Sequence, residues 1–471
     1  MENFWDFSVW GNLNVIGVLL LTLLFANALK RTVSVLRKSL VPTSVLGGLI
    51  LLVVSGIYSA ITKRQLFNEP FFGGEGMSFM EVVTYHALAL GFIASSLKSS
   101  EKKMTKKRAT EVFNTGVTTV STYLLQGVLG LGITIAAAFV MDGFFEAAGL
   151  LLPFGFGQGT GQALNYGTIY QTEYGFIGGR SFGLTIAALG FLSASLGGVI
   201  HLAILKKTRK VKPLFDEDGV ITSEQIQSKD EIAVNGGLDK LTVQIGLVAV
   251  CYVLTFGLMY LLGTAFPGMR SVVFGFNFLI GVLMASLLKV VLNFLRKKKI
   301  VKKQYTNNFL LDRISNTCFD LMVVAGIAAI RLDVVKEYWV IMIILALVGL
   351  VVTYTYNYFV AKTLFKEYQE EQFLAMYGML TGTASTGIVL LREIDGEFKT
   401  PAADNLVYQN FPAIVFGFPI MFLATFAPKE PLLTLGILFV FFIVMNLLLF
   451  RSKIFKSKKK EVEVIAETEK E

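Results

Sequence analysis

Two glycine-rich stretches of this chain carry more polar side chains than the apolar sequence around them. Residues 157–165 read GQGTGQALN, and residues 381–387 read TGTASTG. Glycine lets the backbone turn tightly and approach a ligand, and the amides and hydroxyls add neutral donors and acceptors. Unwound backbone can offer carbonyls to a sodium ion, and the N–H groups that begin a half-helix can bind a carboxylate. The alternative is structural, with glycines that allow close helix packing and hydroxyls that satisfy freed backbone groups.

From these stretches we predict two sets of ligand-binding residues. The set that we expect to bind substrate contains Gln158, Gly159, Thr160, Gly161, Gln162, Asn165, Thr383, Ser385 and Thr386. The set that we expect to bind sodium, a hard cation that prefers oxygen ligands, contains Gly157, Thr381 and Gly382. Carbonyls of unwound backbone at the middle of a membrane are typical ligands of coupling ions.

Arg392 follows the second stretch directly and is a fixed cation for an anionic substrate. An arginine at membrane depth costs about 3 kcal/mol on insertion scales unless it is paired or hydrated. A guanidinium also binds a carboxylate in bidentate geometry, and we therefore add Arg392 to the substrate set. The alternative is that it pairs with one of the acids that follow it, or reaches the interface.

Asp320 lies well inside an apolar run, and intramembrane acids mark functional sites by default. Asn316 is one turn earlier on the same helical face. We add both to the sodium set. Asp320 is also a candidate proton carrier, or a partner for an arginine such as Arg313 or Arg392.

The composition predicts a membrane protein. The chain has 471 residues, of which 54% are hydrophobic and 16% charged, and its mean hydropathy is +0.62. Soluble domains average about 25% charged residues, and the apolar runs are near the length that spans a bilayer as a helix. The predicted spans are 8–29, 41–62, 79–97, 113–141, 181–205, 241–264, 272–295, 309–330, 338–360, 409–427 and 431–450. The alternating pattern of a membrane barrel is absent.

Basic residues in short loops set the predicted topology. They follow the first, third, fifth and seventh spans, and the positive-inside rule therefore puts these loops in the cytoplasm and the N-terminus outside. This distribution also argues against nucleic acid as the reason for the net charge of +9. Alternation then requires residues 149–170 to enter and leave from outside, and residues 373–392 to enter and leave from inside.

The predicted fold is an all-α polytopic membrane protein with two inverted repeats. Each repeat has five transmembrane helices, with a re-entrant hairpin between its fourth and fifth helix. The first repeat covers residues 1–205, a cytoplasmic linker covers 206–240, and the second repeat covers 241–430. Residues 431–471 form one extra transmembrane helix and a charged cytoplasmic tail.

Several function classes lack their sequence signals. Two cysteines and two histidines, far apart, imply no transition-metal site. The chain has no GxxxxGK[ST] loop for ATP and no GxSxG nucleophile elbow. We therefore expect no cofactor and no enzyme activity, and we expect a secondary transporter whose partners are a small substrate and the lipid bilayer.

At these hairpins the sequence resembles the glutamate:sodium symporter family, over roughly residues 10–430. The family's Gly-rich first vertex is similar to GQGTGQA at 157–163, and its second vertex to GTASTGI at 382–388. Further similarities are VPTSVLGGL from residue 41, Tyr-Gly-Phe at 174–176, and FGLTIAALGFLSASLGG at 182–198. A polar element before the second hairpin corresponds to Ser315, Asn316 and Thr317, which adds Thr317 to the sodium set.

The resemblance implies sodium-coupled uptake of glutamate across a bacterial inner membrane, by an elevator motion of a homodimer. The chain departs from the family pattern at four positions. Gln158 stands where the vertex has histidine, Ser385 where it has proline, Arg392 where an amide is usual, and Asp320 where the residue is apolar. These departures leave open a related amino acid or dicarboxylate as substrate. The alternatives are a proton-coupled organic-anion transporter, an ion channel of similar fold and a membrane enzyme.

Overall fold

The computed structural model describes residues 3–98, 105–209, 239–299, 306–396 and 398–454, and within them every regular element is a helix. The first half contains α1 (Phe7–Thr32), α2 (Ser34–Lys38), α3 (Thr43–Thr62), α4 (Gly76–Leu97), α5 (Lys106–Ala138), α6 (Leu151–Tyr174) and α7 (Gly179–Arg209). The second half contains α8 (Lys240–Ala265), α9 (Arg270–Gly275), α10 (Asn277–Lys297), α11 (Asn308–Ala328), α12 (Leu332–Val335), α13 (Trp339–Leu364), α14 (Gln369–Leu380), α15 (Ala384–Arg392), α16 (Ala402–Tyr408), α17 (Asn410–Phe426) and α18 (Pro431–Leu449). Most of the predicted linker and of the predicted tail lies outside the described residues.

The described residues contain nine helices that are long and apolar enough to cross a membrane, or ten if the bent pair α16–α17 counts as one span. The predicted total was eleven. The span predicted at 309–330 does form a helix, α11, but it is not among those nine. Asp312, Arg313 and Asp320 lie within it and lower its hydropathy. The span predicted at 409–427 is α17, which meets α16 at an angle of 50°.

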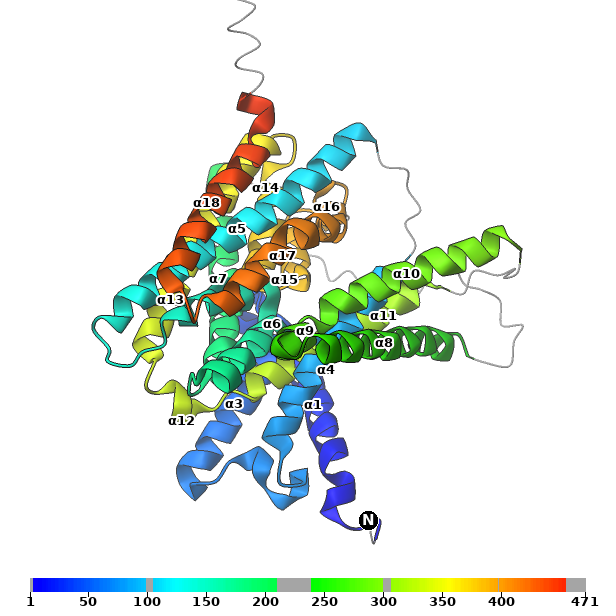
Figure 1. Cartoon of the computed structure of the whole chain (residues 1–471), viewed down its shortest axis with the longest axis vertical. Coiled ribbons are helices and arrows are strands. Elements are labelled where there is room, and N and C mark those ends of the chain that lie inside the picture. The colour runs from blue at the N-terminus through cyan, green and yellow to red at the C-terminus, as the bar shows by residue number, and fades with distance from the viewer. Residues whose placement is uncertain (1–2, 99–104, 210–238, 300–305, 397, 455–471) are drawn as a thin grey trace, which may run out of the picture.

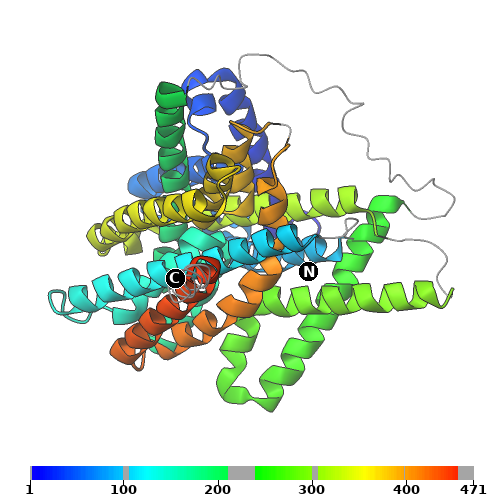
Figure 2. The ribbon, with the colours of Figure 1, turned by 90° about the horizontal axis from the view of Figure 1, so that it is seen from above.

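The helices pack in two groups (Figure 1). The α4–α11 group consists of α1, α3, α4, α8, α10 and α11, in which α4 packs against α11, α10 and α8. The hairpin group consists of α5, α6, α7 and α13 to α18, in which α5 packs against α13, α17 and α18. Figure 2 shows the same separation from above, with α13 and α18 on one side and α10 on the other.

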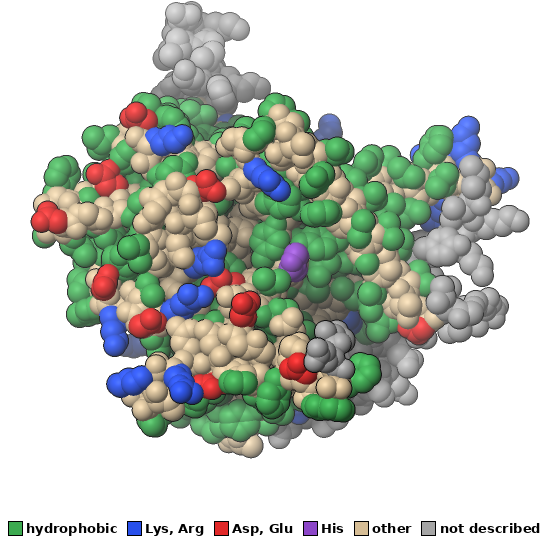
Figure 3. Space-filling model, turned by 60° about the horizontal axis from the view of Figure 1, so that its bottom comes forward, with side chains coloured by type: hydrophobic (Ala, Val, Ile, Leu, Met, Phe, Trp, Pro, Cys, Tyr) green, Lys and Arg blue, Asp and Glu red, His purple; other side chains and the backbone are tan. Residues whose placement is uncertain are grey.

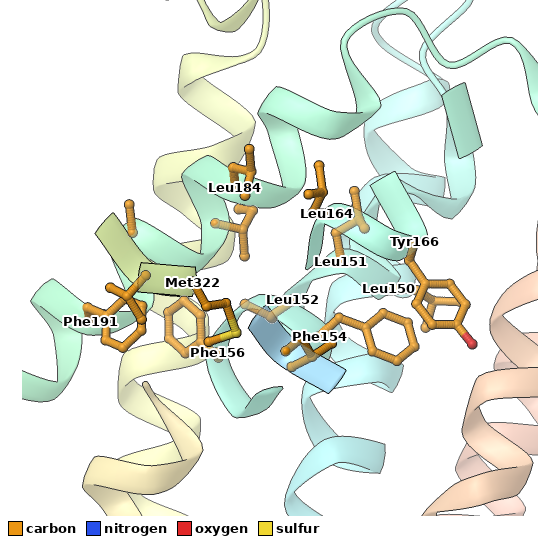
Figure 4. Packing of buried hydrophobic residues seen from close by; sticks show 14 of the residues in the cluster. Leu150, Leu151, Leu152, Phe154, Phe156, Leu164, Tyr166, Leu184, Phe191 and Met322 are labelled. Atoms are coloured by element: carbon orange, nitrogen blue, oxygen red, sulfur yellow. The ribbon is translucent and has the colours of Figure 1, made fainter. Parts of the chain in front are cut away.

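Helix α6 folds back on itself at Gly159, whose φ of 75° and ψ of −168° are not helical. The rings of Phe154 and Tyr166 stack with centroids 3.9 Å apart, and Figure 4 shows both in the surrounding core. In a continuous helix, twelve residues would separate them by about 18 Å. Residues 151–174 therefore form a helical hairpin, called hairpin 1 below, within the segment predicted to be re-entrant.

Helices α14 and α15 form a second hairpin, hairpin 2, which turns at residues 381–383. The two helices pack closely where Gly378 faces Gly387, because a Cβ on Gly378 would lie 2.8 Å from the Cα of Gly387. Larger residues at these two positions would push the helices apart. Each hairpin thus folds back where the sequence predicts it, while its entry and exit on one side of a membrane stays a prediction.

Three tyrosines attach hairpin 1 to α17. The hydroxyls of Tyr166, Tyr170 and Tyr174 donate to the backbone carbonyls of Met421, Ala424 and Thr425, each at 2.8 Å. Two of the three side chains, Tyr166 and Tyr170, are fully buried. This tyrosine ladder joins the second half of hairpin 1 to the C-terminal part of α17.

The core and the surface follow the pattern expected in lipid. Hairpin 1 is buried along almost its whole length, although it is rich in glycine and polar side chains. Large apolar side chains are exposed on most long helices, and Figure 3 shows them over much of one face, with charged side chains among them. Exposed apolar helices around buried polar hairpins are favourable in the lipid of a membrane and unfavourable in water.

Candidate functional site

The vertices of the two hairpins lie against each other. A Cβ placed on Gly159 would lie 3.1 Å from Cγ2 of Thr383 and 3.7 Å from the carbonyl oxygen of Gly382. Gly159 is at the turn of hairpin 1, and Thr383 is at the turn of hairpin 2. The structure therefore brings together the two glycine-rich stretches that the sequence places more than two hundred residues apart.

Only glycine fits the turn of hairpin 1 well. The φ of Gly159 is +75°, in a region where a Cβ clashes with the backbone of an L-residue. The contact with Thr383 adds a second restriction, because any side chain at position 159 would push hairpin 2 away. Gly159 can therefore allow the close packing of the two turns and at the same time expose its backbone to a ligand.

Helix α11 supports the first vertex from the side. The Thr160 hydroxyl donates to the carbonyl of Met322 at 3.1 Å, and Gly326 faces Thr160 so closely that a Cβ there would lie 2.7 Å from the Thr160 Cβ. Gly161 faces the sulfur of Met322. Thr160 and Gly161 are therefore buried against α11. In this arrangement they hold the first vertex in place on α11.

Gln162 keeps a free amide donor beside the vertex. Asn165 Nδ2 donates both to Gln162 Oε1 at 2.6 Å and to the carbonyl of Gly275 at 3.1 Å. Because that carbonyl can only accept, the orientation of the Asn165 amide is fixed, and with it that of Gln162. Gln162 Nε2 is then buried and has no partner among the described residues. A buried unpartnered donor indicates a ligand or water at this position.

Several polar groups of the vertices remain accessible. Gln158 and Thr383 are partly exposed, and Ser385 is exposed. Thr386 is buried, and its hydroxyl lies 3.4 Å from that of Thr383. The protein therefore does not cover these groups completely in this arrangement.

Some backbone carbonyls near the two turns already accept hydrogen bonds from side-chain hydroxyls. Tyr123 donates its hydroxyl to the carbonyl of Gly157 at 2.9 Å, and Thr381 donates its hydroxyl to the carbonyl of Tyr377 at 2.6 Å within its own helix. Gly382 is buried at the turn. A carbonyl oxygen has two lone pairs, so the bond from Tyr123 does not by itself exclude Gly157 as a cation ligand.

Asn316, Thr317 and Asp320 form an exposed polar stripe on α11, together with Arg313 one turn before them. Positions 313, 316, 317 and 320 share one helical face. Ser44 at the start of α3 lies near the carboxylate of Asp320. The stripe ends two residues before Met322, which contacts the first vertex, and thus leads along α11 toward the site.

Arg392 is not brought to the vertices. It is the last residue of α15, at about 12 Å from the start of that helix by the helical rise. Its side chain is exposed, and its guanidinium lies 5.3 Å from the centroid of the Phe398 ring. In this arrangement Arg392 stacks on an aromatic ring at the base of hairpin 2, far from the turn.

A partly buried ion-pair cluster joins the two helix groups, and sequence reasoning missed it. Glu81 on α4 binds Arg180 at the start of α7 at 2.8 Å, and Arg331 beyond α11 at 3.5 Å. The backbone N–H of Arg331 also donates to the hydroxyl of Ser181 at 3.2 Å. All these residues lie at ends that the predicted topology puts outside. Charged residues near span ends are usually topology signals, so the sequence held no indication that these residues pair.

Polar residues inside α5 also escaped the sequence reasoning. Gln126 Nε2 donates to the carbonyl of Leu380, the last residue of α14, at 3.0 Å. A signal existed, since the segment TTVSTYLLQ at residues 118–126 is rich in polar side chains for a membrane span. Helix α5 therefore contacts both hairpins, through Tyr123 and through Gln126.

Glu393, just beyond α15 and outside the membrane-spanning helices, yields a prediction of pH dependence. Burial raises the pKa of its carboxyl to about 7, against the opposing effect of the ammonium groups of Lys206 and Lys30. Between the usual 4.5 and about 7, the folded protein holds a proton that the unfolded chain has released. The free energy of unfolding therefore falls as the pH rises through this window, by roughly 3 kcal/mol.

We expect Glu393→Gln to flatten this dependence, because the amide stays neutral at every pH. Melting temperatures in detergent at pH 5, 6, 7 and 8 measure it, with Glu367→Gln, an exposed acid, as the control. An identical decline from pH 5 to pH 7 in the wild type and in Glu393→Gln would contradict the prediction.

A comparison with protein families finds one match to this site and its surroundings. The family model described as sodium/glutamate symporter matches residues 10–399. The match contains both hairpins and α11, and it ends before α16, whereas the resemblance in the sequence was taken to residue 430. A search of curated proteins finds no match to the chain. Because the match covers most of the chain, the protein belongs to the sodium/glutamate symporter family of membrane transporters.

Proposed function

We propose that this protein is a sodium-coupled symporter of glutamate or of a related amino acid or dicarboxylate. The observation that carries the proposal is the contact of Gly159 with Thr383 and Gly382 at the two hairpin vertices. Interrupted helices that meet in this way are where secondary transporters bind substrate and coupling ions. The family match supports sodium and glutamate in particular.

The proposed substrate site lies between the exposed sides of the vertices. Helix α15 begins at Ala384, directly after the turn, so its first N–H groups face the vertex, and its cap residue Thr383 makes no side-chain cap hydrogen bond. A carboxylate bound there gains both hydrogen bonds and the favourable end of the helix dipole. The side-chain amide of Gln158 and the free Nε2 of Gln162 then form hydrogen bonds with the remaining polar groups of the substrate. We leave Arg392 out of this site because α15 carries it to the other end of the hairpin.

The proposed sodium site uses carbonyls of Gly157 and Gly382 near the turns, with the α11 stripe of Asn316, Thr317 and Asp320 as the approach. The exposed stripe begins at the end of α11 that the positive-inside rule assigns to the cytoplasm. The Glu81 cluster and the hydrogen bond from Ser271 to Glu173, at 2.6 Å, join the helix groups at the opposite side. We therefore propose that this arrangement is open to the cytoplasm, with the N-terminus outside and the C-terminus inside.

We further propose that the hairpins are re-entrant parts of two inverted repeats, and that the hairpin group moves against the α4–α11 group in an elevator-like cycle. The packing of the helices into two separate groups supports this motion, because each group can then move as a unit. Such a cycle exposes the site to each side of the membrane in turn. A homodimer and a bacterial inner membrane follow from the resemblance of the sequence to its family.

Uptake into proteoliposomes tests the proposed function. We expect radiolabelled glutamate to accumulate above its external concentration when an inward sodium gradient is applied, and to stop doing so when choline replaces sodium. Each sodium ion that enters down 100 mV supplies about 2.3 kcal/mol, before the concentration term. Accumulation is also the result that separates a symporter from a channel, which only equilibrates its substrate.

Proton coupling is the second candidate, and the exposed acid Asp320 on α11 favours it. Uptake that persists in choline and follows an inward proton gradient would overturn sodium coupling. In that case Asp320→Asn is expected to remove the gradient dependence, because the amide cannot carry a proton.

A further inference from the structure

Helices α5 and α13 carry the same polar pattern and meet through it in opposite directions. Gln126 on α5 donates from Nε2 to the hydroxyl of Thr353 on α13, at 2.7 Å. Asn357 on α13 donates from Nδ2 to the hydroxyl of Thr122 on α5, at 3.3 Å. Each helix thus presents a threonine and, four residues later, an amide, and each amide donates to the threonine of the other helix. All four side chains are at least 98% buried.

The orientation of both amides is fixed by backbone carbonyls. Gln126 Nε2 also donates to the carbonyl of Leu380 at 3.0 Å, and Asn357 Nδ2 also donates to the carbonyl of Thr353 at 2.9 Å. A carbonyl can only accept, so the nitrogen of each amide must face it. The amide oxygens, Gln126 Oε1 and Asn357 Oδ1, then point elsewhere.

Both of these oxygens are buried and have no hydrogen-bond partner among the described residues. An unsatisfied buried acceptor costs about 1–3 kcal/mol, and each such atom in a native protein calls for an explanation. The two interhelical contacts lie one turn, or about 6 Å, apart along each helix. Side chains of this length bring their oxygens within reach of a single bound species.

The surroundings favour a cation of low charge. Leu380 is the last residue of α14, and the C-terminal carbonyls of a helix carry partial negative charge. The ligands at the crossing are neutral oxygens, whereas divalent ions usually require carboxylates. Within the described part of the chain, no cluster of three His, Cys, Asp or Glu residues could hold a metal ion.

We propose that Gln126 Oε1 and Asn357 Oδ1 are ligands of a second sodium ion, at the crossing of α5 and α13 behind hairpin 2. This inference rests on the sodium coupling proposed above and adds a site that is separate from the vertices. An ion there holds α5 and α13 together and fixes Gln126 in the position from which it binds Leu380. Because the turn of hairpin 2 begins at the next residue, the ion orders the substrate-binding vertex without touching the substrate.

Sodium binding to the full-length protein in detergent tests the inference. The melting temperature is measured without substrate as sodium replaces choline at constant ionic strength, because a ligand that binds only the folded state raises it. We expect Gln126→Leu and Asn357→Leu to raise the sodium concentration for the half-maximal shift by about tenfold, the loss that one ligand oxygen explains at 1.4 kcal/mol. Gln126→Glu, which keeps acceptor oxygens and loses the donor, is expected to retain the sodium response.

Gln409→Leu is the matched control. Gln409 is also a buried amide that contacts hairpin 2, through the sulfur of Met379, but its oxygen is satisfied by Thr119 at 2.8 Å. We expect this variant to lose stability while keeping the sodium concentration of the half-maximal shift. An unchanged half-maximal concentration in both leucine variants at the crossing overturns the site and assigns the two oxygens to water. A wild type with no sodium response at all overturns the proposed sodium coupling instead.

Discussion

Replacing Gly159 with leucine is expected to abolish sodium-driven uptake, with initial rates about 100-fold below the wild type or lower. The backbone at this residue has a φ of +75°, which strains any residue with a Cβ. A side chain would also meet Thr383 at 3.1 Å from its first carbon atom. The two vertices must then separate, and the groups that we propose to bind the substrate lose their mutual positions. Gly382→Leu is expected to act in the same way, because its Cβ would lie 2.8 Å from Oγ1 of Thr386.

Gly257→Leu in α8 is the control for this experiment, since nothing lies within 4 Å of a Cβ at that position. It adds the same side chain to a membrane helix, and we expect near wild-type uptake. Initial rates in proteoliposomes are compared at equal amounts of inserted protein. Wild-type rates in Gly159→Leu and Gly382→Leu would contradict the assignment of the site and leave close packing as the use of these glycines.

The second large effect is expected at the Glu81 cluster. Glu81→Gln leaves the guanidinium groups of Arg180 and Arg331 side by side without their shared carboxylate, whereas Arg180→Met leaves the pair of Glu81 with Arg331 in place. Removing one partner of a fully buried ion pair costs about 3–5 kcal/mol, while exposed pairs contribute about 0–1 kcal/mol. The Glu81 cluster is partly buried, so we expect a cost between these two limits. We therefore expect Glu81→Gln to lower the melting temperature clearly more than Arg180→Met does, and the double variant to recover part of the loss.

The exposed pair of Lys107 with Glu367 gives the comparison. Its side chains are 66% and 72% exposed, while those of Arg180 and Glu81 are 29% and 10% exposed. Exposed pairs contribute about 0–1 kcal/mol, so the corresponding cycle at Lys107 and Glu367 should show additive shifts. Additive shifts in the Glu81–Arg180 cycle as well would mean that this cluster does not hold the helix groups together.

Local sequence was sufficient to predict where the chain folds back. A run of glycines with amides or hydroxyls between apolar segments conflicts with a simple membrane span, and both hairpins occur at such runs. Gly159 could be singled out because a turn of this kind needs a residue without a Cβ. The all-helical class follows equally from composition, since an apolar chain must satisfy its backbone within each segment.

Contacts between distant segments were beyond the reach of a single sequence. Glu81 and Arg180 are charged residues near span ends, where most charges only mark topology. Gln126 and Asn357 lie in two different spans, and the polar residues around Gln126 do not say which helix it meets; only the crossing of α5 and α13 makes the two amides partners. Arg392 shows the opposite error, because closeness in sequence to the vertex suggested closeness in space, and nine helical residues carry it away.

The tyrosine ladder makes α17 a natural place for a reporter of transport. Tyr166, Tyr170 and Tyr174 tie the second half of hairpin 1 to the carbonyls of α17, so any displacement of the vertex must carry α17 with it. Phe411, in the first turn of that helix, is 77% exposed. A fluorophore attached there would report on the proposed motion of the hairpin group from a position away from the proposed substrate and sodium sites.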